Sequence, residues 1–371
     1  MTITIPSAAV VPFKIGDIIK EQYTLIKQIG AGSYGAIFEA IYQNGILSKH
    51  VAIKFEKIVF DRPMLLNEII ILKALTTNKH FARFYQYGTH EKYKFVAMDL
   101  LGPSLIDLVN RKRPYRFNLH SILKFGVQAI DTLLALHKAG FVHRDIKPSN
   151  FVIGNTVETS SRVYLIDFGL CKKLFMKDGF VVQPPLKGNF RGTVRYASIN
   201  SHRKRELGRQ DDLMSLIYIF VEFYTGGLPW VNITNPDEVL LLKEHYQGGG
   251  LLTNMPPEFK QFEDHILSLT YTTEPDYQLL TSIMYQIAKN NKIDINQPFD
   301  WEKEMQLMRE IKKQEKQAEQ TKMQIQAGQT NENSKSSPKT GKGILNPFSQ
   351  IVSENSKPNN NAASTQDTRK I

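Results

Sequence analysis

Residues 143–150 read "HRDIKPSN" and bring an aspartate, a lysine and an asparagine into one short polar segment. Asp145 can accept the proton of an attacking hydroxyl, Lys147 can neutralise a transferring phosphoryl group, and Asn150 can hold a metal ion. Phosphoryl transfer needs positioned positive charge and a metal ion more than it needs covalent help from a protein. The segment is therefore a candidate centre for that chemistry.

A second acidic candidate follows in "YLIDFG", residues 164–169, after a short expected hairpin. Asp167 ends an apolar strand, where its carboxylate can bridge a Mg²⁺ ion to the β- and γ-phosphates of a nucleotide. Asn150 and Asp167 are therefore the candidate metal ligands, with ATP and Mg²⁺ as the expected cofactors.

A glycine-rich segment lies upstream, where residues 29–40 read "IGAGSYGAIFEA". Gly30, Gly32 and Gly35 form a G-x-G-x-x-G pattern that dinucleotide-binding proteins share, but there the third glycine opens a helix. Here an alternating strand pattern follows instead. A glycine-rich hairpin lets backbone N–H groups lie close over a triphosphate, although the pattern alone would favour a plain glycine hairpin.

Two further charged residues follow the glycine-rich segment. Lys54 in "VAIK" lies on the third expected strand, where its ammonium can hold the α- and β-phosphates, and Glu68 lies on the next expected helix. The carboxylate would keep the lysine charged, because desolvation in a cleft favours loss of its proton. Alone the pair would be read as a surface ion pair. With "HRDIKPSN" and "DFG" it predicts a nucleotide site.

Hydrophobic periodicity divides the chain into a β-rich part, a helical part and a polar tail. Residues 23–98 alternate β-rich segments with turns around one helical segment. Later apolar runs have helical spacing, and one of them has an N-cap at Asn118 and a stop at Gly140. The expected order is an N-terminal extension at 1–22, a domain at 23–300 with lobes at about 23–98 and about 102–300, a charged helix at 301–327 and a disordered polar tail at 328–371.

These motifs, in this order, resemble the protein kinases over roughly residues 23–290. The segments "MDLLGPSL", "HRDIKPSNF", "GTVRYASIN" and "DDLMSLIYIFVEFYTGGLPW" are similar to the casein kinase 1 superfamily of Ser/Thr kinases. Within it, "FRGTVRYAS", Ser149, "GRQDDL" and "EPDYQLL" are most similar to the tau-tubulin kinase branch. The resemblance implies an α+β, bilobal protein kinase fold, with a small antiparallel sheet lobe carrying one helix and a larger, mainly helical lobe.

The resemblance also implies roles for individual residues. Met98 falls at the gatekeeper position behind the adenine, and Asp99 and Leu101 fall on the hinge, whose backbone would bond the adenine edge. Asp212 falls where family members hold the backbone of the catalytic loop. The expected catalytic residues are Asp145, Lys147, Lys54 and Glu68, and the expected nucleotide-binding residues are Ile29, Gly30, Ala31, Gly32, Ser33, Tyr34, Gly35, Ala36, Ile37, Ala52, Lys54, Met98, Asp99, Leu101 and Val152.

The end of the activation segment differs from that of most protein kinases, which raises the question whether the chain is an active enzyme. Most members close the activation segment with a small residue, Pro and Glu, whereas residues 198–200 read "SIN". The casein kinase 1 superfamily has the same replacement and is active, and the residues that hold nucleotide, metal and hydroxyl are all present. We therefore expect an active Ser/Thr kinase. The alternative is a pseudokinase-like scaffold that binds acidic protein surfaces or microtubules.

The charge balance favours acidic partners, because 47 Lys and Arg against 36 Asp and Glu give a formal net charge of +11. The resemblance points first to Arg195, with Arg191 nearby, as residues that bind an acidic or phosphorylated residue beside the substrate hydroxyl, since guanidinium groups pair with phosphate. The alternative interpretation of these arginines is that they belong to a solvated basic loop.

Microtubule-associated proteins are candidate partners. A nucleic-acid-binding protein is a distant third hypothesis, and neither nucleic acid nor a membrane is an expected partner.

Two further features of the sequence bear on the cellular compartment of the protein. A single cysteine, Cys171, excludes an intramolecular disulfide framework and favours a reducing compartment. The N-terminus lacks the basic start and apolar block of a secretory signal. We expect a monomeric cytoplasmic protein, with the nucleus and the cytoskeleton as further places where it acts.

Overall fold

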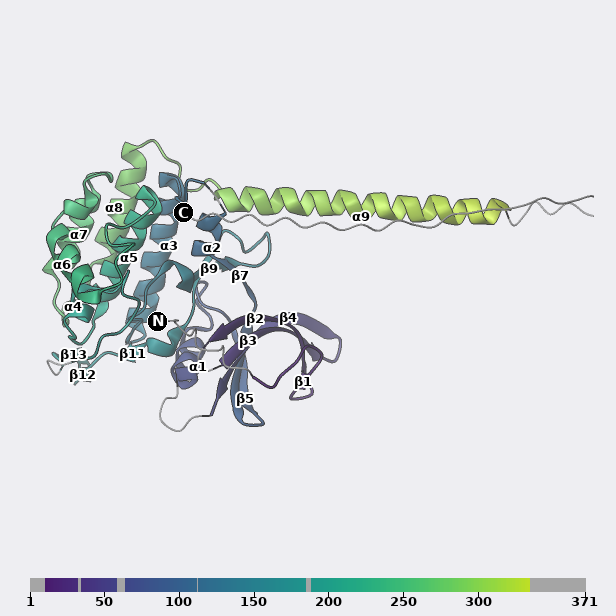
Figure 1. Cartoon of the computed structure of the whole chain (residues 1–371), viewed down its shortest axis with the longest axis horizontal. Coiled ribbons are helices and arrows are strands. Elements are labelled where there is room, and N and C mark those ends of the chain that lie inside the picture. The colour runs from purple at the N-terminus through teal and green to yellow at the C-terminus, as the bar shows by residue number, and fades with distance from the viewer. Residues whose placement is uncertain (1–10, 33–34, 59–63, 112, 185–187, 334–371) are drawn as a thin grey trace, which may run out of the picture. The chain divides into compact units, whose positions relative to one another are not determined.

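The computed structural model describes residues 11–32, 35–58, 64–111, 113–184 and 188–333 (Figure 1). The chain divides into two units, Met1–Ile311 and Lys312–Ile371. All the elements described next lie in the first unit, apart from the later turns of the final helix. Ser33 and Tyr34, predicted to bind nucleotide, and residues 334–371 of the predicted tail lie outside the described residues.

The small lobe is an antiparallel sheet of order β1-β2-β3-β4-β6-β5 that curls on itself (Figure 1). Period-two alternation in β3 buries Phe38 and Ala40 in the sheet core and leaves Ile37 on the opposite face. The elements are β1 (Ile18–Ile19), β2 (Tyr23–Gly32), β3 (Gly35–Asn44), β4 (Leu47–Lys57), β5 (Phe84–His90), β6 (Tyr93–Asp99) and one helix, α1 (Met64–Leu75).

The large lobe is built around α3 (Leu119–Lys138), which packs against α5 (Arg209–Thr225) and α8 (Tyr277–Asn290). The Asn118 side chain caps α3 by accepting from the Ser121 N–H, and Gly140 follows the helix with a positive φ of 83°. Both predicted ends are thus confirmed. The other helices are α2 (Leu105–Asn110), α4 (Ile199–His202), α6 (Pro236–Tyr246) and α7 (Phe259–Ser268).

By length and composition alone, α3 is apolar enough to cross a membrane, but 56% of that apolar window is buried inside the protein. The apolar residues of α3 form part of the large core cluster that α5 and α8 also enter. Packing in this core therefore accounts for the composition of the helix.

Short strands that follow the small lobe in the chain hold the segment at residues 143–150 in place. β8 (Phe141–Val142) pairs with β11 (Lys172–Lys173), and β9 (Phe151–Gly154) lies between β7 (Leu101–Ser104) and β10 (Val163–Leu165). Residues 143–150 therefore connect two strands whose positions are set by hydrogen bonding, and they end in the 3₁₀ turn η1 (Pro148–Asn150). A second turn, η2 (Phe168–Leu170), follows Asp167, and the hairpin of β12 (Met176–Lys177) and β13 (Phe180–Val181) comes later.

These lobes confirm the predicted fold class: a curled antiparallel sheet with one helix and a larger helical lobe. The charged helix predicted at residues 301–327 is α9 (Asp300–Asn333), which continues past the expected start of the tail at residue 328. A single glycine costs a helix only about 1 kcal/mol, so Gly328 does not stop α9. Its first turn belongs to the large lobe, since Trp301 is buried and its Nε1 donates to Ser160 O at 3.0 Å.

Candidate active site

A cavity of about 620 Å³ lies between the curled sheet and the strands β7 and β9. The predicted nucleotide-binding residues converge on it from β2, β3, β4, β6, β7 and β9. Gly32 ends β2, opposite Gly35. The predicted residues that line the cavity are Ile29, Gly30, Ala31, Gly35, Ala36, Ile37, Ala52, Lys54, Met98, Asp99, Leu101 and Val152, together with Glu68, Asn150 and Asp167.

The cavity has apolar walls that come from both lobes. Ala52 pairs with Met98 across β4 and β6, and Ile37 projects from β3. Val152 enters from β9 in the large lobe. A flat apolar ring between two lobes would bury both faces against such walls, while the backbone after Met98 would offer hydrogen bonds at its edge.

Lys54 on β4 directs its ammonium group to two carboxylates. Its Nζ donates to Glu68 Oε2 at 2.6 Å and lies 3.4 Å from Asp167 Oδ1. Burial alone would lower the pKa of Lys54, but the charges of Glu68 and Asp167 outweigh burial and raise it. For Asp167, burial acts to raise the pKa, and the charges of Lys54, His143 and Lys147 lower it. The lysine is therefore held charged and directed into the cavity.

The segment at residues 143–150 brings Asp145 and Lys147 together. Lys147 Nζ donates to Asp145 Oδ2 at 2.6 Å and to Thr193 Oγ1 at 3.2 Å, and Thr193 Oγ1 donates to Asp145 Oδ1 at 2.9 Å. Both oxygens of Asp145 therefore have a fixed direction. A hydroxyl that approached Asp145 would also meet the positive charge of Lys147.

Asn150 and Asp167 fit the role of metal ligands. Asn150 Nδ2 donates to Asp145 O at 2.9 Å, which leaves the amide oxygen of Asn150 as the group available to a cation. Among the described residues there is no cluster of three or more His, Cys, Asp or Glu that could hold a metal ion. An amide oxygen and a carboxylate suit Mg²⁺, which keeps few protein ligands and takes others from substrate phosphates.

Asp212, at the start of α5, holds the backbone of the loop at residues 143–150 by hydrogen bonds. It accepts hydrogen bonds from the backbone N–H groups of His143 at 2.7 Å and Arg144 at 2.8 Å, and it lies 2.9 Å from His137 Nε2. Burial acts to raise the pKa of this carboxyl, but its contacts with His137 lower it. This is the arrangement that the kinase resemblance implies for Asp212.

The "SIN" replacement is tied into the large lobe by Asp211. Ser198 Oγ donates to Asp211 Oδ1 at 2.7 Å, Asn200 Nδ2 donates to the same oxygen at 2.9 Å, and Gly208 N donates to Oδ2 at 2.8 Å. Burial raises the pKa of Asp211 to about 6. These hydrogen bonds fix the position of residues 198–200. The segment is therefore anchored although it lacks the Pro and Glu of most protein kinases.

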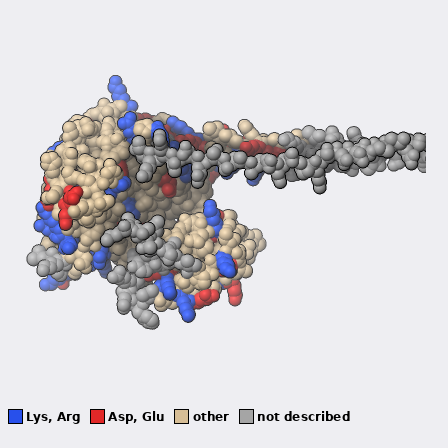
Figure 2. Space-filling model, viewed as in Figure 1, with Lys and Arg blue, Asp and Glu red and all other residues tan. Residues whose placement is uncertain are grey.

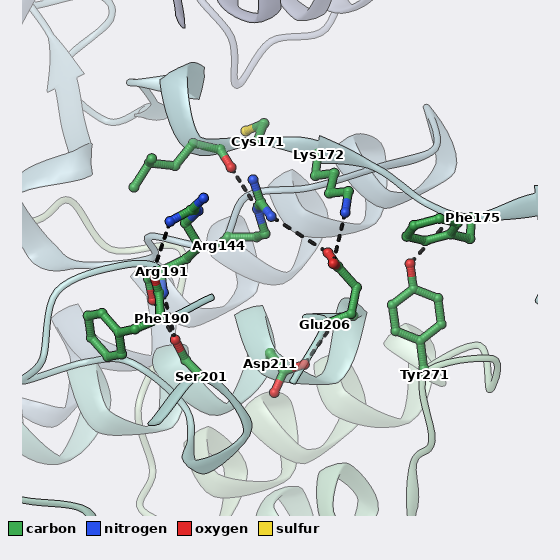
Figure 3. A network of polar contacts seen from close by, with 12 residues as sticks. Arg144, Cys171, Lys172, Phe175, Phe190, Arg191, Ser201, Glu206, Asp211 and Tyr271 are labelled. Carbon is green, nitrogen blue, oxygen red and sulfur yellow. Dashed lines mark hydrogen bonds and ion pairs between the residues drawn. The ribbon is translucent and has the colours of Figure 1, made fainter. Parts of the chain in front are cut away.

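The two predicted substrate-binding arginines occupy different places. Arg195 lines a second cavity, of about 510 Å³, together with Lys147, Thr193 and Trp230. Its Nη1 also forms an ion pair with Glu222 Oε1 at 3.2 Å, and its side chain is 39% exposed. Arg191 is not among the described residues that line this cavity; its side chain lies beside that of Arg144 (Figure 3).

Sequence reasoning missed two residues of the site. Thr193 bridges Asp145 and Lys147, and Glu222 on α5 holds Arg195 and also accepts from the Tyr196 hydroxyl at 2.5 Å. Thr193 lies within "GTVRYASIN", so the motif carried a signal for it. Nothing local in the sequence marks Glu222, which reaches Arg195 only through tertiary packing.

Residues 23–340 match the family described as protein kinase domain, and the chain belongs to this family. It is similar to a "Probable serine/threonine-protein kinase" of Dictyostelium discoideum, with 39% identity over 290 residues, covering 78% of this chain and 58% of that relative. It is also similar to Casein kinase I homolog 1 of Schizosaccharomyces pombe, with 32% identity over 298 residues (77% and 65%), and to Casein kinase I homolog 2, with 31% over 294 residues (76% and 66%). The chain thus spans about three fifths to two thirds of the length of these relatives.

Proposed function

We propose that this chain is a Ser/Thr protein kinase that transfers the γ-phosphate of ATP to hydroxyl groups of proteins. One observation carries the proposal: Lys54 lies between Glu68 and Asp167 in the cavity that Asn150 also lines. A charged lysine, a carboxylate and an amide group then line the same cavity. Family membership and the names of the relatives point the same way.

Each residue has a distinct task in the proposed reaction. The backbone of the glycine-rich hairpin and Lys54 hold the phosphates, and Asp145 orients the substrate hydroxyl and accepts its proton. Lys147 neutralises charge on the moving phosphoryl group, and Asn150 and Asp167 hold the metal. Bound Mg²⁺ supplies charge neutralisation at the β- and γ-phosphates. The phosphoryl group passes directly to the substrate, so the chain needs no covalent intermediate.

A transfer assay tests this proposal. Purified full-length chain, Mg²⁺ and ATP labelled at the γ-phosphate are incubated with casein, and Asp167→Asn serves as the matched variant because it removes one charge and keeps the shape. Label on casein well above the variant is expected. Incorporation no greater than that of Asp167→Asn would refute the kinase and favour the scaffold alternative.

The proposed substrate is a protein that has an acidic or phosphorylated residue near the target Ser or Thr. Arg195 supports it, because its partly exposed guanidinium lines a cavity that Lys147 and Thr193 also line. A substrate carboxylate or phosphate would compete there with Glu222. On the face shown in Figure 2, Lys and Arg are interspersed with Asp and Glu.

The finer assignments belong to the same proposal. The motifs around "FRGTVRYAS" and "EPDYQLL" support a place in the tau-tubulin kinase branch, with microtubule-associated proteins as candidate substrates. A monomer that acts in the cytoplasm, and also in the nucleus or at the cytoskeleton, fits a chain whose single cysteine is a buried free thiol. Fractionation of cells that express the tagged chain, with light scattering of the purified protein, tests both assignments.

A further inference from the structure

A buried lysine on α6, to which the proposed reaction gives no task, binds the backbone around Arg195. Lys243 is 2% exposed, and its Nζ donates to Val194 O at 2.7 Å and to Ala197 O at 2.6 Å. The indole of Trp230 completes the set, because its Nε1 donates to Arg195 O at 2.9 Å. The backbone is therefore held at Arg195 and on both sides of it.

The hydrogen-bond partners described for this lysine are uncharged. Besides the two carbonyl groups, Nζ lies 3.2 Å from His202 Nε2, and the ring centres of Tyr218 and Trp230 lie 5.0 Å and 5.3 Å away. Burial lowers the pKa of Lys243 to about 6 and that of His202 to about 4. Buried polar groups are stable only when they are hydrogen-bonded, so the positions of the lysine and of the two carbonyl groups depend on each other.

The side chain of Arg195 reaches two places, so the course of its backbone matters. Its Nη1 pairs with Glu222 Oε1 at 3.2 Å, and its side chain is 39% exposed. It also lines the second cavity, of about 510 Å³, together with Lys147. Lys243 is not among the described residues that line this cavity. The lysine would therefore act on a substrate only through Arg195.

Thr193, at the start of the same segment, is held by other bonds. Its side chain donates to Asp145 Oδ1, and its carbonyl oxygen accepts from the N–H groups of Tyr196 at 2.9 Å and Ala197 at 2.8 Å. Loss of the contacts that the buried lysine makes should therefore disturb the arginine more than it disturbs Asp145. Substrate choice, rather than the transfer step, is the property that we expect to change.

We propose that Lys243 is a positioning residue for substrate choice: together with the indole N–H of Trp230, it holds the backbone around Arg195 and keeps the guanidinium in the second cavity, where it binds a carboxylate or phosphate of the substrate. This inference rests on the proposed function and deepens its account of substrate choice. Because Lys243 touches neither nucleotide nor substrate in this assignment, its loss should raise the KM for acidic peptides and leave the KM for ATP unchanged.

The experiment uses the full chain, Mg²⁺, ATP and pairs of peptides that carry either phosphoserine or alanine at the same position near the target Ser. Lys243→Met keeps the length of the side chain and removes its N–H groups. This variant is expected to lose about tenfold in kcat/KM on the phosphopeptide, mostly through KM, and less than about twofold on the alanine peptide. Lys260→Met, at the exposed pair with Asp264 on α7, is the matched control and should change neither value.

A double variant tests whether Lys243 acts through Arg195. If it does, Lys243→Met should add nothing to the loss that Arg195→Ala causes on the phosphopeptide, because both changes remove the same contact with the substrate. Independent effects would instead multiply to a loss of about a hundredfold, and that result would overturn the inference.

If Lys243→Met does not fold, as judged by thermal unfolding, Trp230→Phe replaces it, since Phe keeps an aromatic ring and removes the N–H that binds Arg195 O. The same selective loss on the phosphopeptide is expected. A variant that keeps both rates, or loses both equally, would overturn the inference and leave the kinase function standing. A wild-type chain without preference for the phosphopeptide would overturn the inference and the acidic substrate together. A wild-type chain that labels neither peptide nor casein would refute the kinase function itself.

Discussion

Thr193 donates its hydroxyl proton to Asp145 Oδ1 at 2.9 Å while the same oxygen, Oγ1, accepts from Lys147 at 3.2 Å. One hydroxyl group therefore sets the direction of the two side chains that would meet a substrate hydroxyl. The contact joins the loop at residues 143–150 to a residue far along the chain, and it forms only when the segment that carries Thr193 lies against that loop.

The first prediction concerns this hydroxyl. Thr193→Val keeps the shape and removes both hydrogen bonds, so kcat for a protein substrate should fall about tenfold with little change in the KM for ATP. Thr193→Ser keeps the hydroxyl and should remain near the wild-type rate. Steady-state kinetics on casein measure both variants. A Val variant as fast as the Ser variant would mean that the hydroxyl has no part in positioning Asp145.

The second prediction concerns the buried ion pair of Lys54 and Glu68, whose oxygen and nitrogen lie 2.6 Å apart. Lys54→Met should abolish transfer and lower the free energy of unfolding by about 3 kcal/mol, because it leaves the buried carboxylate unpaired. The double variant with Glu68→Leu should regain much of that stability and none of the activity. Urea denaturation without nucleotide measures the stability.

Lys260→Met is the control for this series, because Lys260 pairs with Asp264 on the surface of α7 and should contribute less than about 1 kcal/mol. If Lys54→Met were as stable as Lys260→Met, Glu68 would not depend on its lysine partner in the folded protein.

The third prediction is a pH dependence that arises at Lys243 on α6. This side chain is 2% exposed, and its Nζ donates to Val194 O at 2.7 Å and Ala197 O at 2.6 Å, on either side of Arg195. Burial lowers the pKa of the ammonium from 10.5 to about 6. Between these values the unfolded chain binds one proton more than the folded chain, so the free energy of unfolding rises with pH.

Lys243→Met lacks this titration. Between about pH 7 and about pH 8.5, the stability of the wild type should therefore rise by about 2 kcal/mol relative to Lys243→Met, as measured by denaturation at each pH. A constant difference between the two proteins would indicate that the ammonium remains charged between the two carbonyl groups.

The fourth prediction concerns substrate choice. Arg195→Ala should reduce kcat/KM about tenfold on peptides with an acidic or phosphorylated residue near the target, since a charge-assisted contact is lost. Turnover of neutral peptides should change little. Arg309→Ala, which removes an exposed arginine paired with Glu158, is the matched control. An equal loss on both kinds of peptide would argue that Arg195 supports the site only through Glu222.

Much of the nucleotide site could be predicted because each of its parts is a local pattern. The glycine-rich hairpin, Lys54 on its strand and Asp167 at the end of another strand each follow from a short run of sequence, and their order along the chain implies their assembly. Glu222 and Glu206 could not be predicted in this way. Each meets its arginine across a long stretch of chain, and no periodicity links the members of such a pair.

The sequence by itself therefore predicted the α+β class from periodicity and motifs, and the ends of α3 from capping. It also predicted, from side-chain chemistry and motifs, which groups would hold nucleotide and metal, and the structure places these groups around one cavity. Only the tertiary structure decided which carboxylates compensate the charges of Arg195, Arg144 and Lys172. Arg195 meets Glu222, and Arg144 and Lys172 share Glu206, because a buried charge requires a partner close in space and the fold alone sets that distance.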